Sequence, residues 1–89
     1  MGSAIPEARP AEQDARTEAA VMRQLLALHP VQLGFDELLR ELGIDVARFE
    51  QRDAVERAVR ELAAAGLLHR NGKLIVPTRA ALRLDQLLG

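Results

Sequence analysis

The chain has 89 residues, no cysteine and a formal net charge of −1 at pH 7. This length suits one small domain, and the lack of cysteine excludes disulfides and thiolate metal sites. No apolar run approaches the roughly 18–20 residues that a membrane-spanning helix needs, and the N-terminus lacks the pattern of a secretory signal. We therefore expect a soluble, cytoplasmic protein that does not contact a membrane.

Charge is distributed unevenly along the chain. Residues 1–56 carry 6 basic and 11 acidic side chains (net −5), whereas residues 57–89 carry 6 basic and 2 acidic ones (net +4). This asymmetry points to a polyanion on one face. The only aromatic residues are Phe35 and Phe49. Because single-stranded nucleic acids are held by stacking on aromatic rings, the composition favours a duplex over a single strand.

The N-terminal part predicts a tail followed by a helix. Prolines interrupt residues 1–11, so we expect a flexible tail there and a single domain over residues 12–89. A helix over residues 12–29 would place its apolar residues and one histidine on an arc of about 160°, namely Val21, Met22, Leu25, Leu26, Leu28 and His29. An arc of this width suggests contact with both the core and a second chain.

The middle of the chain predicts a short strand and a short helix. Residues 31–33 are partly β-branched and could pair with a later hairpin. Apolar residues at i, i+3, i+4 and i+7 from Phe35 to Leu42 mark a helix, which Gly43 can cap. After a polar connection, Phe49 is expected to fill the core.

A longer helix is predicted at residues 51–65, followed by a hairpin and a last helix. The buried stripe of the longer helix would consist of Val55, Ala58, Val59 and Leu62, and Gly66 would end it in the left-handed conformation. Asn71-Gly72 stands between two apolar runs, which is the pattern of a two-residue type I′ turn. This turn would place Arg70 opposite Lys73. Thr78 would cap a helix over residues 79–88, with Leu82 outside its core arc. The members of that arc would be Ala80, Ala81, Leu84, Leu87 and Leu88.

This order of elements, with RELAAAGLLHRNGKLIVPT at residues 60–78, resembles the winged helix-turn-helix domains of bacterial transcriptional regulators. The resemblance covers about residues 12–89. It implies an α+β, mostly α fold, in which a three-helix bundle carries a small antiparallel hairpin, the wing, and a C-terminal fourth helix. It also implies that the third helix enters the major groove and the wing contacts the backbone. The long connection at residues 43–50 and the short hairpin loop depart from the family pattern.

Six side chains are candidates for contact with duplex DNA, all on the third predicted helix or the hairpin: Gln51, Arg52, Arg57, Arg60, Arg70 and Lys73. Arginine and lysine contact phosphates and guanine edges, and glutamine can contact adenine. An alternative interpretation needs no ligand. Asp53 and Glu56 can pair with arginines one turn later, as on ordinary solvated helices, and charges on a hairpin can simply keep a sheet edge soluble.

Enzymatic and metal chemistry are not indicated by the sequence. Ser3 is the single serine, and no nucleophile–base combination can be built. His29 and His69 stand without nearby cysteine, so we expect structural roles for them and no metal site. We also expect no cofactor and no small-molecule site.

Two functional hypotheses remain open. The first is a small DNA-binding transcriptional regulator that forms a homodimer, or binds a partner protein, through the terminal helices; the interface candidates are Met22, Leu26, His29 and Leu82. The second is a winged-helix protein-interaction module that does not bind nucleic acid. The near-zero net charge and the acidic start of the third predicted helix favour the second hypothesis.

Overall fold

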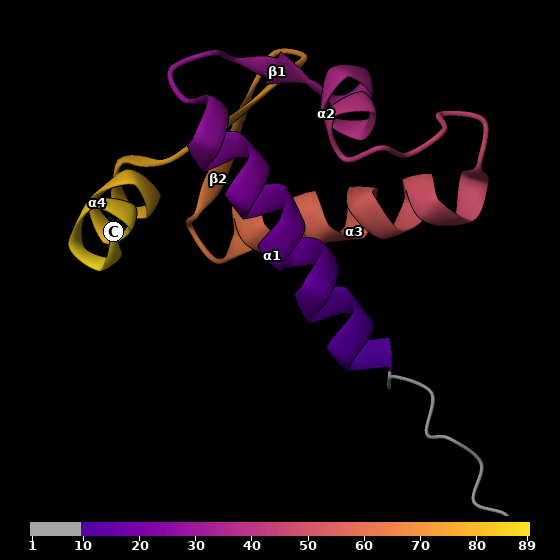
Figure 1. Cartoon of the computed structure of the whole chain (residues 1–89), viewed down its shortest axis with the longest axis horizontal. Helices are drawn as coiled ribbons and strands as arrows, with labels where there is room; N and C mark the ends of the chain where they lie inside the picture. Colours follow the sequence, from indigo (N-terminus) through magenta and orange to yellow (C-terminus); the bar gives the residue numbers. More distant parts are fainter. Residues whose placement is uncertain (1–9) are drawn as a thin grey trace, which may run out of the picture.

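The computed structural model describes residues 10–89, which form four helices and a small antiparallel sheet (Figure 1). In chain order the elements are α1 (Pro10–Leu28), β1 (Leu33–Gly34), α2 (Phe35–Glu41), α3 (Phe49–Ala64), β2 (Leu68–Asn71), β3 (Leu74–Pro77) and α4 (Arg79–Leu88). The chain is therefore α+β and mostly helical, as predicted. Most of the predicted tail, residues 1–9, lies outside the described residues. No helix of the described part is long and apolar enough to span a bilayer.

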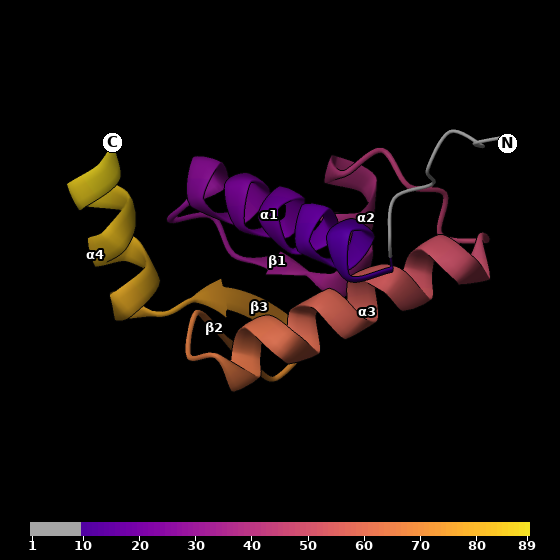
Figure 2. The same ribbon diagram turned by 90° about the horizontal axis from the view of Figure 1, so that it is seen from below.

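The core lies where α1 crosses α3 (Figure 1) and where both helices meet the sheet (Figure 2). The predicted stripe of α3 is confirmed, because all four of its members are buried: Val55, Ala58, Val59 and Leu62. Their spacing of three and four residues places them on one side of the helix. α1 contributes Val21 and Leu25, and α2 contributes Leu38 and Leu39, to the same cluster. Gly66 ends α3 with φ +83°, as predicted.

The sheet has the strand order β1-β3-β2, and both pairs are antiparallel. A short strand before α2 does pair with the hairpin, as predicted, but it occupies Leu33–Gly34 rather than residues 31–33. Leu33 is buried opposite Ile75, whereas Val31 is 60% exposed. The pairing partner, rather than β-branching, therefore decides which residues become the strand.

The predicted hairpin turn is wrong by one residue. Asn71 pairs with Leu74 and Arg70 pairs with Ile75, so the two central turn residues are Gly72 and Lys73. Gly72 has φ +63° and no other residue of the turn has a positive φ. A type I′ turn needs positive φ at both central residues, whereas glycine in the first central position alone is the type II′ pattern. Each strand partner moves by two positions, so Leu68 and Ile75 still share the core-facing side.

Phe49 does not fill the core, contrary to the prediction. It is the first residue of α3 and its side chain is 75% exposed. Ile44 packs against the core within the connection between α2 and α3, so the chain leaves the core before it reaches Phe49. Residues 49–53 are all exposed. The first turns of α3 consequently project past α2 (Figure 1).

α4 begins as predicted but packs differently. The Thr78 hydroxyl accepts a hydrogen bond from the Ala81 amide (3.2 Å) and donates one to the Gly66 carbonyl (2.7 Å). Ala81 is the buried residue of this helix, whereas Leu84, Leu87 and Leu88 of the predicted core arc are 48%, 65% and 79% exposed. α4 lies beyond the end of the sheet, where it contacts β3, and so most of its apolar arc stays uncovered (Figure 1).

Candidate nucleic-acid interface

A hollow of about 560 Å³ lies between α2, the first turns of α3 and the hairpin turn. Four cationic side chains from α2, α3, β2 and the hairpin turn line it: Arg40, Arg52, Arg70 and Lys73. Two carboxylates, Asp36 and Glu37, also line it. The hollow therefore has four positive groups against two negative ones, although the whole chain has a net charge of −1.

Arg52 is positioned by an aromatic ring. Its guanidinium carbon lies 5.7 Å from the centre of the Phe35 ring, which is within the range of a cation–π contact. Phe35 is half-buried and packs against the core. The contact therefore holds Arg52 beside the hollow, next to the start of α2.

The backbone engages one of the two carboxylates. Glu37 accepts a hydrogen bond from the Gly34 amide at 2.9 Å, which satisfies a donor at the start of α2. A carboxylate in the first turn is also stabilised by the helix dipole. The negative charge of Glu37 beside the hollow thus stabilises the start of α2.

Arg70 is tied to α3 by an ion pair. One of its terminal nitrogens lies 3.3 Å from a carboxylate oxygen of Glu56, and the two side chains are 46% and 43% exposed. A pair this open to water contributes about 0–1 kcal/mol to stability. Lys73 is exposed at the centre of the turn. The prediction that Arg70 and Lys73 are cross-strand partners is wrong, because Arg70 pairs with Ile75.

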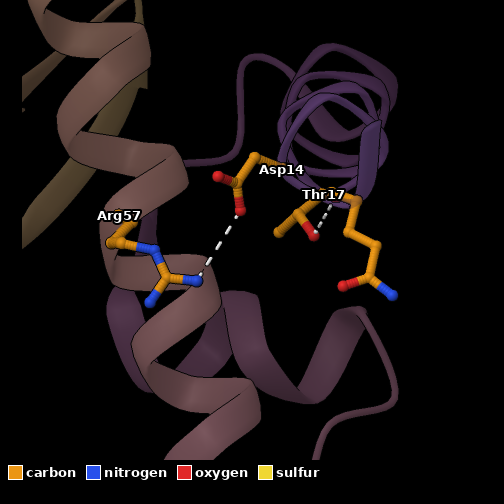
Figure 3. A network of polar contacts seen from close by, with 4 residues as sticks. Asp14, Thr17 and Arg57 are labelled. Carbon is orange, nitrogen blue, oxygen red and sulfur yellow. Dashed lines mark hydrogen bonds and ion pairs between the residues drawn. The ribbon is translucent and has the colours of Figure 1, made fainter. Parts of the chain in front are cut away.

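Arg57 does not join this cluster. Its guanidinium lies 3.6 Å from a carboxylate oxygen of Asp14 in α1, whose neighbour Thr17 donates a hydrogen bond to the Gln13 carbonyl (Figure 3). A hollow of about 310 Å³ beside Arg57 is also lined by Asp14, Glu18 and Glu61. Three carboxylates around one guanidinium repel a polyanion.

The other two predicted DNA contacts, Gln51 and Arg60, are exposed on α3 and line neither of these hollows. The pairings expected along α3 are also replaced, since Arg57 pairs with α1 and Glu56 with β2. Both arrangements follow from tertiary contacts that helical spacing does not contain.

The predicted interface residues fall in different places. Met22 and Leu26 line an apolar hollow of about 160 Å³ between α1 and α4, and its other apolar members are Leu67, Ala81, Leu84 and Leu88. Leu82 is half-buried and lies beside Arg79, Arg83 and Gln86 instead. His29 and His69 are both exposed.

Comparisons with protein-family models, curated proteins and solved structures found no match to this chain. The site must therefore be interpreted from its own chemistry. The sequence prediction missed Arg40 because it lies on a short helix that carries no other basic residue. It missed Leu84 and Leu88 as interface candidates because they were assigned to the core. Their membership of one apolar arc on α4 was the signal that could have found them.

Proposed function

We propose that this chain is a winged-helix domain that binds duplex DNA with the cationic hollow between α2, α3 and the hairpin. The observation that carries the proposal is the convergence of Arg40, Arg52, Arg70 and Lys73 on one hollow. The strand order β1-β3-β2 and the succession of α2, α3 and hairpin agree with the resemblance of residues 60–78 to winged helix-turn-helix domains.

In this proposal the DNA backbone lies along the hollow. Arginine and lysine supply the charge-assisted hydrogen bonds that fix a protein on phosphates, and such contacts carry no sequence information. The projecting first turns of α3 then extend towards the base edges, where Gln51 is an exposed hydrogen-bonding side chain. Arg57 takes no part, because Asp14 holds it on the other flank of α3.

The acidic groups near the site set the expected strength of binding. Three carboxylates oppose phosphate here: Asp36 lines the hollow, Glu56 pairs with Arg70, and Asp53 follows Arg52 in the sequence. Release of counterions must therefore supply much of the affinity. Because Arg70 is paired with Glu56, the other three cations of the hollow supply three phosphate contacts, which correspond to a slope of log K against log salt of roughly −3. Binding should therefore be measurable at low salt and weak near physiological salt.

The proposal is tested by fluorescence anisotropy of a labelled mixed-sequence duplex between 50 and 200 mM salt. Replacing Arg52 and Lys73 by alanine is expected to weaken binding on every sequence and to reduce the salt slope by about 2. The matched control replaces Arg79 and Arg83 of α4, which removes the same charge away from the hollow. No binding at 50 mM salt, or an equal effect of both double variants, contradicts the proposal.

A protein-interaction module is the second candidate function. The observation in its favour is the apolar hollow between α1 and α4, whose rim includes the exposed Leu84 and Leu88. Such a surface fits an apolar helix of a partner or of a second copy. Absence of DNA binding together with a solution mass above that of the monomer would favour this candidate over the first.

A further inference from the structure

Phe49 is an exposed aromatic side chain that does not belong to the hydrophobic core. The chain has two aromatic residues, and the other one, Phe35, packs against the core and against Arg52. Phe49 is 75% exposed, and Val46, three residues earlier, is 41% exposed. Phe49 is the first residue of α3 and Val46 lies in the connection before it, so apolar side chains are exposed at and just before the start of this helix. Single exposed apolar residues are common, so the surroundings of Phe49 must decide what it does.

The charges around Phe49 disfavour a phosphate at this position. Arg48 and Arg52 are balanced by Glu50 and Asp53, and all four side chains are exposed. Arg52 also lines the hollow, so the other three charges around the start of α3 sum to −1, whereas the hollow, with Arg52 counted there, has two more cations than anions. In the proposed complex the phosphate backbone of the DNA therefore contacts the hollow, and the contact of the tip of α3 is apolar.

Helix geometry also places Phe49 on the outward stripe of α3. Arg60 follows eleven residues later, which is three turns and about 20° further round the helix. The buried residues Val55 and Leu62 lie about 120° and 140° round the helix from Phe49, and Val59, at the edge of the buried side, lies about 80° from it. A helix that entered the major groove by this stripe would bring Phe49 to the base edges first.

We infer that Phe49 contacts the C5-methyl group of thymine in the major groove and makes the protein prefer thymine at that position. The inference rests on the proposed DNA binding. Thymine is the standard base that presents a methyl group in the major groove, and phenylalanine is one of the side chains that contact it. The groove is about 12 Å wide and admits a helix.

The test compares two duplexes that differ only in this methyl group. One alternates adenine and thymine, and the other alternates adenine and uracil, so charge and hydrogen-bonding groups are the same. The wild-type chain should bind the thymine duplex about fourfold more tightly per contacted methyl group. Phe49→Ala should remove this preference, and because phenylalanine is neutral the salt slope should stay unchanged.

Leu87→Ala is the matched control, because Leu87 is another apolar residue that is largely exposed (65%), on α4. It should retain the preference for thymine, and both variants should melt like the wild type. Equal wild-type affinity for the two duplexes overturns the inference and leaves the proposed DNA binding intact. Failure to bind either duplex at low salt removes both. A lower sedimentation mass caused by Phe49→Ala, without any thymine preference, would assign this surface to a protein contact and also overturn the inference.

Discussion

The ion pair between Glu56 and Arg70 offers a gain-of-binding test of the proposed interface. Glu56→Gln keeps the shape of the side chain and removes its charge. Because both partners are more than 40% exposed, the change should cost at most about 1 kcal/mol of the free energy of unfolding. Its main effect should be to free the Arg70 guanidinium, which lines the same hollow as Arg52 and Lys73.

The size of the effect follows from one added phosphate contact. On duplex DNA each contact changes the slope of log K against log salt by about −0.9. At 0.1 M salt this corresponds to roughly eightfold tighter binding, and less at higher salt. The gain should be independent of sequence, because phosphate contacts do not distinguish bases.

The assay is a salt titration of anisotropy with a mixed-sequence duplex, accompanied by thermal melting. Glu61→Gln is the matched control, since it removes the same charge from α3 on the side of α1 and Arg57. Global charge acts equally in the two variants, so only the difference between them reports on Arg70. If Glu56→Gln binds no more tightly than Glu61→Gln, the assignment of Arg70 to the DNA contact is refuted.

Three further predictions concern stability and assembly. Leu62→Ala should lower the free energy of unfolding by about 2–5 kcal/mol in urea denaturation, because the side chain is buried on α3; a loss below 1 kcal/mol would contradict its place in the core. Thr78→Ala should cost about 0.5–2 kcal/mol through loss of the cap, and Thr78→Ser, which keeps both hydrogen bonds, should restore most of it. Leu84→Asp should reduce the sedimentation mass of any assembly while the monomer stays folded, and Gln86→Asp, away from the apolar hollow, should not; the same mass for both would exclude this hollow as the interface.

Features that depend on one helix or one residue could be predicted from the sequence. The stripe of α3, the left-handed Gly66 and the cap at Thr78 each follow from spacing or from the chemistry of a single side chain. The hairpin was also predictable, but its turn was not. Asn71-Gly72 can form the centre of a type I′ turn, or Gly72 can begin a type II′ turn with Lys73, and the pairing of Asn71 with Leu74 gives the second arrangement.

Features that depend on contacts between elements could not be predicted. Phe49 was assigned to the core because it is aromatic, yet Ile44 already packs there and the chain turns away. The pairing of Arg70 with Glu56 joins residues 14 positions apart, and no periodicity contains it. The cationic hollow likewise draws its side chains from four segments. Such sites become visible only when the chain is folded.

The loose packing of α4 means that this helix can open without the rest of the domain. Its buried anchor is Ala81, and its start is held by the hydrogen bonds of Thr78. Amide hydrogens of residues 79–88 should therefore exchange with solvent through local opening, much faster than those of the buried part of α3. A protein bound between α1 and α4 would slow this exchange, whereas DNA at the hairpin would leave it unchanged. The exchange rate of one helix thus distinguishes the two kinds of partner.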